Sequence, residues 1–217
     1  MWPSLSRSPV LKQWAWSQLV LDAYEQNEHF LKRRTVFNAL PDTSNSIVDG
    51  LMAVHIRHGD FAHHCPFLAN WSAAYNGFNT FDSLPDRFTP PPGGGGGKTT
   101  PENQQIYEDH CIPSISRIVQ RIEEIKAERK GHGASLKRLY ILTNAKRPWL
   151  AKLKQALDDA AIGEWDMIAS SRDLELNKEQ KYIAQNVDMY IASRAQIFIG
   201  NGVSLFISLF FHLPTVF

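Results

Sequence analysis

The chain has 217 residues, of which 43% are hydrophobic and 21% are charged, a composition typical of a folded protein and not of a disordered one. Its 23 Lys and Arg residues nearly balance its 22 Asp and Glu residues, so the net charge of +1 gives no general attraction to nucleic acid or to an anionic membrane surface. Two cysteines exclude a disulfide-dense miniprotein and a four-cysteine zinc site.

The two ends of the chain carry no clear targeting signal. The short apolar stretch at residues 14–21 is followed at once by Asp22 and Glu25, so no signal peptide is visible. Residues 196–217 contain no formally charged residue, but polar residues and a proline interrupt this apolar segment. We expect a buried strand and a buried helix there, and not a membrane anchor. The apolar ending also leads us to expect that the chain stops before the last elements of its domain.

The first part of the chain predicts one helical segment, one strand and one insertion. Apolar residues at roughly helical spacing occupy residues 10–40, and a turn-rich stretch follows. Residues 51–56 form a short apolar run that ends in Arg57-His58-Gly59-Asp60, which is typical of a buried strand that enters a loop. Residues 66–101 are rich in Asn, Pro and Gly, which predicts a long and flexible surface insertion.

From residue 102 onward, predicted helices and strands alternate. They comprise a helix at 102–130, a strand at 139–142, a helix at 148–157, a strand at 165–168, a helix at 178–194, a strand at 196–199 and an apolar helix after a glycine-containing turn. This alternation predicts an α/β fold with a mostly parallel sheet, in which ligands bind at the carboxyl ends of the strands. We therefore divide the chain into an N-terminal helical segment, 1–45, and a Rossmann-like lobe, 46–217, that carries the insertion.

Two features resemble ligand sites but fit them poorly. The glycine run ends in Gly97-Lys98-Thr99, as a P-loop does, but a proline occupies position 92, where the P-loop pattern requires glycine. The histidines at 55, 58, 63 and 64, together with Cys65, match no standard zinc spacing. We expect neither an ATP site nor a metal site.

Arg57-His58-Gly59 directly after a strand resembles the signature of histidine phosphatases, in which the histidine attacks phosphorus and arginines hold the phosphate. The acid-phosphatase branch has a second arginine two residues after the glycine, where this chain has Phe61. None of the later histidines is followed by an acidic residue, as that family would require. Despite these two departures from the pattern, a phosphomonoesterase that uses His58 remains an alternative.

A longer match includes the same residues. The segment 55–61, His-Ile-Arg-His-Gly-Asp-Phe, resembles the His-x-Arg-x-Gly-Asp-aromatic motif of the GDP-fucose protein O-fucosyltransferases and their fungal relatives. Residues 188–195 and 198–206 resemble the family's aspartate-containing helix and its Phe-Ile-Gly-Asn segment with a serine-rich turn, and residues 140–144 resemble its middle segment. The resemblance covers residues 51–212 in pieces, with the insertion between them.

This resemblance implies a lobe similar to the second lobe of a GT-B glycosyltransferase, in enzymes whose donor binds mainly to that lobe. The chain has room for this lobe only. We therefore expect it to be a donor-binding lobe that transfers fucose from GDP-fucose to a protein or glycan hydroxyl when a first lobe completes it. The resemblance also implies that the protein is located in the lumen of the secretory pathway. A non-catalytic GDP-binding module is a further alternative.

The chemistry of this transfer suits the residues of the match. Negative charge develops on the β-phosphate as the glycosidic bond breaks, and Arg57 could hold that charge with two parallel hydrogen bonds, so we expect it to be catalytic and expect no metal or other cofactor. The resemblance implies contacts with GDP-fucose from His55, Arg57, Asp188, Asn201, Ser204 and Phe206. Many members have a second serine or threonine after the first, where this chain has Leu205.

Other roles are open for some of these residues. His55 could instead be a core histidine bonded to the backbone, and Asp188 could be an acidic residue on a helix surface. Cys65 and Cys111 bracket the insertion. In an oxidising lumen they could form a disulfide, whereas in a reducing compartment they would be two buried thiols.

Overall fold

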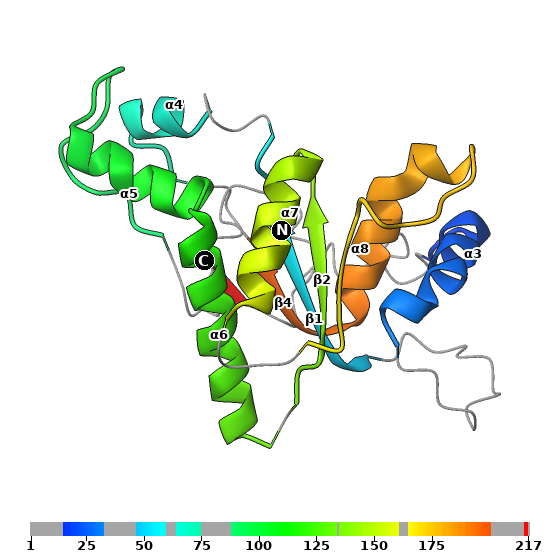
Figure 1. The fold of residues 1–217 in the computed structure, drawn as a ribbon. Coiled ribbons are helices and arrows are strands. Elements are labelled where there is room, and N and C mark those ends of the chain that lie inside the picture. Colours follow the sequence, from blue (N-terminus) through cyan, green and yellow to red (C-terminus); the bar gives the residue numbers. More distant parts are fainter. Residues whose placement is uncertain are drawn as a thin grey trace, which may run out of the picture.

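The structure is a computed structural model that describes residues 15–32, 47–59, 64–74, 88–133, 135–160, 165–200 and 215–216. Its centre is a parallel sheet with the strand order β3-β2-β1-β4-β5 (Figure 1). The strands are β1 (Val48–Ile56), β2 (Arg138–Thr143), β3 (Met167–Ser170), β4 (Ala195–Gly200) and β5 (Thr215–Val216). The prediction of an α/β fold with a mostly parallel sheet is therefore confirmed. The predicted strand at 165–168 was placed two residues too early.

The helices among the described residues are α3 (Gln18–Gln26), α4 (His64–Asn70), α5 (Pro101–Cys111), α6 (Ile115–Gly131), α7 (Arg147–Asp158) and α8 (Ala184–Arg194). Two short 3-10 helices, η1 (Glu28–Phe30) and η3 (Gln180–Ile183), follow α3 and precede α8. The single helix predicted over 102–130 is wrong, because the chain leaves the helical conformation at Ile112, just before Pro113. Ser114 then begins α6 by accepting a hydrogen bond from the Arg117 amide.

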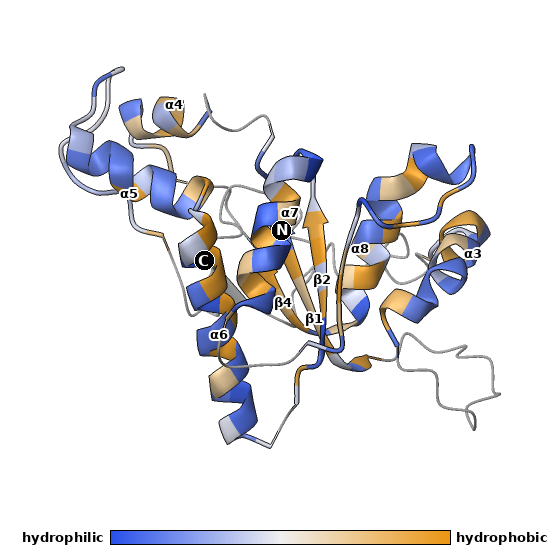
Figure 2. Ribbon diagram, viewed as in Figure 1, coloured by the Kyte–Doolittle hydropathy of each residue, from blue (hydrophilic) through white to orange (hydrophobic). Residues whose placement is uncertain are grey.

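The helices cover the two faces of the sheet in separate layers (Figure 1). On one face, Met52, Val54 and Ile56 of β1 pack with apolar residues of α6 and α7. On the other face, Leu51 and Ala53 pack with α3 and α8. Figure 2 shows that the apolar sides of these helices are turned toward the sheet. Because successive strand residues alternate between faces, His55 belongs to the face of α3 and α8.

The helix α3 belongs to the segment that the sequence analysis separated as 1–45, and it packs into the core of the lobe. Its buried residues Val20, Ala23 and Tyr24 lie in the same cluster as Val187 and Tyr190 of α8. The rings of Tyr24 and Tyr190 meet edge to face with centroids 4.8 Å apart. No helix among the described residues is long and apolar enough to cross a membrane.

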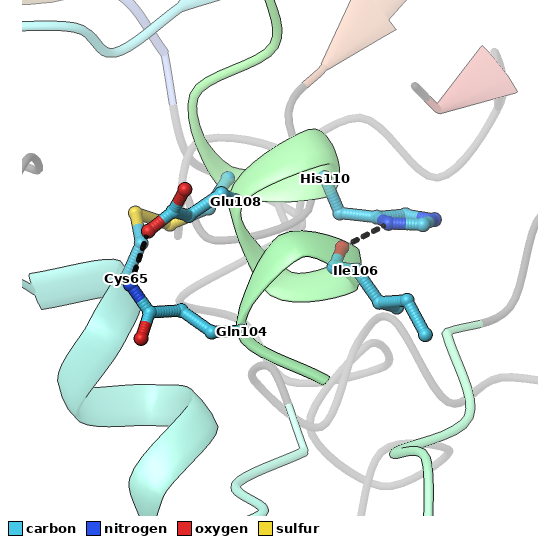
Figure 3. The surroundings of a disulfide bond; sticks show 6 residues. Cys65, Gln104, Ile106, Glu108 and His110 are labelled. Atoms are coloured by element: carbon cyan, nitrogen blue, oxygen red, sulfur yellow. Dashed lines mark hydrogen bonds between the residues drawn. A yellow bond between two sulfur atoms is a disulfide. The ribbon is translucent and has the colours of Figure 1, made fainter. Parts of the chain in front are cut away.

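The described parts of the segment 64–111 are joined to one another. A disulfide links Cys65 in α4 to Cys111 at the end of α5 (Figure 3). The buried Tyr107 hydroxyl donates to the carbonyl oxygen of Ala73 over 2.9 Å. The glycine run leads into α5, where Thr100 caps the first turn and Pro101 occupies a first-turn position that tolerates proline. Residues 75–87 of the predicted insertion lie outside the described residues.

Removal of this disulfide should destabilise the fold. The bridge joins cysteines 46 positions apart. A closed loop of that length lowers the entropy of the unfolded chain, which stabilises the fold by about 3–4 kcal/mol. Replacement of both Cys65 and Cys111 by serine should lower the free energy of unfolding by an amount of this order, measured by urea denaturation. A reductant should destabilise the natural chain similarly and leave the double variant unchanged. Equal stability of the oxidised and reduced natural chain would contradict this expectation.

Candidate functional site

The strand order defines one particular edge of the sheet as a candidate site. The connections from β1 lead to β2 and β3 on one side, whereas β4 and β5 lie on the other side of β1. The order therefore reverses between β1 and β4, and open parallel sheets bind ligands outside the carboxyl ends of the strands at such a point. The residues at this edge are Ile56 and Arg57 of β1 and the loop after it, and Gly200 at the end of β4.

His55 and Arg57 both lie at this point. His55 pairs with Leu142 of β2 on one side and with Gly200 of β4 on the other, and it is buried. Burial, together with the positive charge of Arg57, lowers the pKa of the His55 imidazole to about 4. The ring is therefore neutral near pH 7. Arg57 is partly buried and follows the last residue of β1.

Asp188 comes to the same face of the sheet from the first half of α8. Its Oδ1 accepts a hydrogen bond of 2.6 Å from the hydroxyl of Tyr140, and its Oδ2 accepts one of 2.8 Å from the hydroxyl of Ser171. Tyr140 lies on β2 and Ser171 directly follows β3. The carboxylate thus ties α8 to two strands, and the simple alternative of an acid on a solvated helix surface does not describe it.

Burial is the main cause of the unusual protonation of this network. It raises the pKa of Asp188 to about 6, although the hydrogen bonds from Tyr140 and Ser171 and the charge of Arg172 act in the opposite direction. Burial and the neighbouring carboxylate raise the pKa of Tyr140 well above its usual value, so its hydroxyl remains a donor. The fold is therefore less stable when Asp188 is ionised, and the free energy of unfolding falls as the pH rises through about 6.

A second polar network fixes the turns after β1 and β2. The side-chain oxygen of Asn144 accepts hydrogen bonds from the backbone amides of His58 and Gly59, over 2.9 Å and 3.0 Å. The hydroxyl of Thr143 donates to the carbonyl oxygen of Ile56 over 2.7 Å. Two consecutive residues of the β2 end therefore hold the backbone on both sides of Arg57.

His58, the residue of the phosphatase alternative, lies against α7. Its ring packs on that of Trp149 with centroids 4.1 Å apart, and burial lowers the pKa of its imidazole. Across the part of the chain that the structure describes, no three His, Cys, Asp or Glu side chains come together as a metal site would require. Three predicted contact residues, Asn201, Ser204 and Phe206, lie outside the described residues.

Sequence reasoning assigned no role to Tyr140, Ser171 or Asn144. Tyr140 offered a signal, because a tyrosine in an otherwise aliphatic buried strand needs a partner for its hydroxyl. Asn144 was visible as a polar residue at the carboxyl end of a strand. Ser171 gave no signal of its own, because its role depends on the positions of β2 and α8 in space.

Comparison with known proteins shows one family and one related fold. The model of the family described as GDP-fucose protein O-fucosyltransferase matches residues 23–210. A crystal structure of POFUT1 in complex with GDP has a TM-score of 0.50 and 16% identity, and the match covers 93% of this chain and 46% of that chain. A crystal structure of POFUT1 in complex with GDP-fucose has a TM-score of 0.49 and 16% identity, with the same coverage of 93% and 46%. No curated protein sequence matches. This chain spans about half the length of these solved structures.

The Asp188 network predicts a pH-dependent effect of removing the Tyr140 hydroxyl. Tyr140→Phe takes a donor from a partly buried carboxylate, so it should lower the free energy of unfolding by about 1–3 kcal/mol at pH 8, where Asp188 is ionised. At pH 5 the carboxyl is protonated and the loss should be smaller. Urea denaturation at the two pH values measures the difference.

Tyr107→Phe is a matched control for this experiment. Tyr107 is also buried, but its hydroxyl donates to a backbone carbonyl oxygen, which does not titrate. Its loss of stability should be the same at pH 5 and pH 8. If Tyr140→Phe behaved in the same way as this control, the hydroxyl would not stabilise an ionised Asp188.

Proposed function

Because this chain belongs to the GDP-fucose protein O-fucosyltransferase family, we propose that it binds GDP-fucose at the carboxyl edge of its sheet, beside β1 and β4, with Arg57 as the catalytic residue. The observation that carries this proposal is the position of Arg57, which directly follows the central strand at the point where the strand order reverses. Open parallel sheets bind ligands outside the carboxyl ends of their strands at this point, and a residue immediately after β1 borders that region.

The chemical role of Arg57 follows from the charge of the donor. Transfer breaks the bond between C1 of fucose and the β-phosphate oxygen and forms a bond from C1 to the acceptor oxygen, which releases GDP and the hydroxyl proton. Negative charge grows on the β-phosphate in this step. A guanidinium stabilises such charge with two parallel hydrogen bonds and stays protonated at any relevant pH, so no metal ion is required.

The other residues are assigned supporting contacts. A neutral His55 supplies a hydrogen-bonding group next to the diphosphate without a second charge. Asp188 is already bonded through both oxygens, and each oxygen can accept a further bond from a nucleotide N–H. Asn201, Ser204 and Phe206, on the segment that follows β4, complete the proposed donor site. The acceptor is a protein or glycan hydroxyl, and a further lobe supplies the rest of the active site.

GDP binding to the purified chain tests this proposal. Calorimetry should show that the natural chain prefers GDP to ADP, and that Arg57→Ala weakens GDP binding about 30-fold because a charge-assisted bidentate contact is lost. Arg121→Ala is the matched control, since Arg121 lies on α6 in a surface ion pair with Glu124. It should bind GDP as the natural chain does.

Three other outcomes discriminate among the alternatives. A folded chain that binds no GDP would overturn the proposal. Hydrolysis of a phosphomonoester that disappears in His58→Ala would favour the phosphatase alternative in its place. GDP binding that depends on Arg57, without fucose transfer after a first lobe is supplied, would identify a non-catalytic binding module.

A further inference from the structure

We propose that Asn144 is a positioning residue for Arg57. It fixes Arg57 by accepting hydrogen bonds from the two backbone amides that follow Arg57 in the chain. This inference rests on the proposed function of Arg57. One acceptor atom, Asn144 Oδ1, takes hydrogen bonds from the consecutive amides of His58 and Gly59, over 2.9 Å and 3.0 Å. With Ile56 held by Thr143 on the other side, Arg57 is the single residue between two anchored points.

The contact between the two turns is also close in a steric sense. A Cβ atom placed on Gly59 would lie 3.1 Å from the carbonyl oxygen of Asn144 and 3.3 Å from its side-chain nitrogen. Contacts this short require Asn144 or the turn to shift by a few tenths of an ångström. A side chain at position 59 would therefore crowd the contact between the turn after β1 and Asn144.

Asn144 is itself held from the side of β3. The guanidinium of Arg172 donates to the carbonyl oxygens of Asn144 and Ala145, over 3.0 Å and 3.3 Å. The amide of Ala145 donates to the hydroxyl of Thr143 over 3.0 Å. The turn after β2 is thus fixed by its neighbours on both sides, which is what a support for another residue requires.

The arrangement decides which groups of the loop can meet a diphosphate. Successive backbone amides after a strand often form an anion-binding site. Here the amides of His58 and Gly59 are directed at Asn144 Oδ1. The loop therefore meets an anion with the side chain of Arg57, and the accuracy of that contact depends on how firmly Asn144 holds the turn.

The first test is GDP affinity in Asn144→Ala. Loss of two hydrogen bonds should loosen the turn and weaken GDP binding about tenfold. In the Arg57→Ala background the same change should have an effect below about twofold, because the residue it positions is gone. NMR titration, which reaches millimolar dissociation constants, measures all four chains of this cycle. An unchanged affinity in Asn144→Ala, or an equal loss in both backgrounds, overturns the inference.

Asn177→Ala is the matched control. The side-chain oxygen of Asn177 also accepts from two nearby amides, those of Glu179 and Gln180, over 3.0 Å and 2.9 Å. These residues lie at the start of η3 and are not part of the turns after β1 and β2. This variant should lose stability as Asn144→Ala does and keep the GDP affinity of the natural chain. A tenfold loss of affinity here too would assign the effect to stability alone and overturn the inference.

Gly59→Ala and amide exchange provide independent checks. Gly59→Ala should weaken GDP binding to the same extent and should not add to Asn144→Ala, because both break one contact. Hydrogen exchange of the His58 and Gly59 amides should be faster in Asn144→Ala and stay slow in Asn144→Asp, which keeps the acceptor oxygen. Unchanged exchange in Asn144→Ala overturns the inference without reference to GDP. If the natural chain binds no GDP, the proposed function is wrong, and the positioning role that rests on it is wrong as well.

Discussion

The pairing of β1 with strands on both of its sides is the constraint on which the rest of the structure depends. Residues from Leu51 to Ile56 pair in register with β2, and most of the same residues pair with β4. A parallel strand buried on both faces needs apolar residues at nearly every position, and β1 has them from Leu51 to Val54. This pairing brings the ends of three strands to one edge, so that residues more than 80 positions apart, such as Gly59 and Asn144, can bond directly.

Burial in this region shifts the pKa values of His55 and Asp188 in opposite directions. It lowers the pKa of His55 and raises that of Asp188, in each case by penalising the charged form. The two oxygens of Asp188 accept hydrogen bonds from the hydroxyls of Tyr140 and Ser171, and these bonds stabilise the ionised form together with the charge of Arg172. The neutral imidazole beside Arg57 adds no charge of its own. In the site that we propose, the positive charge that meets an anion at the end of β1 is therefore that of Arg57 and not that of His55.

The sequence was sufficient to predict β1, β2 and β4, and to predict β3 to within two residues, because apolar runs are local properties. It failed at 112–114, where helical spacing continues across a break that depends on Pro113 and on the Ser114 cap. Through a family resemblance it predicted site roles for Arg57 and Asp188, but it did not predict the residues that bond to Asp188 or to the turn beside Arg57. Tyr140 and Ser171 acquire their roles only when β2, the end of β3 and α8 lie side by side, and Asn144 acquires its role only when the ends of β1 and β2 are neighbours.

Two ways of binding phosphate at the end of a strand differ in what they demand of the chain. A loop that offers backbone amides needs glycines and a following helix, and it tolerates many side-chain changes. The loop after β1 has the amides of His58 and Gly59 directed at a side chain from the neighbouring turn. The site that we propose therefore depends on side chains from several segments: Arg57 for the charge, Asn144 for the turn and Arg172 for the support of Asn144. A side-chain site of this kind is lost more easily by single substitutions. It also gains in directional accuracy, because a guanidinium fixed at its base can meet two phosphate oxygens at once, whereas an amide meets only one.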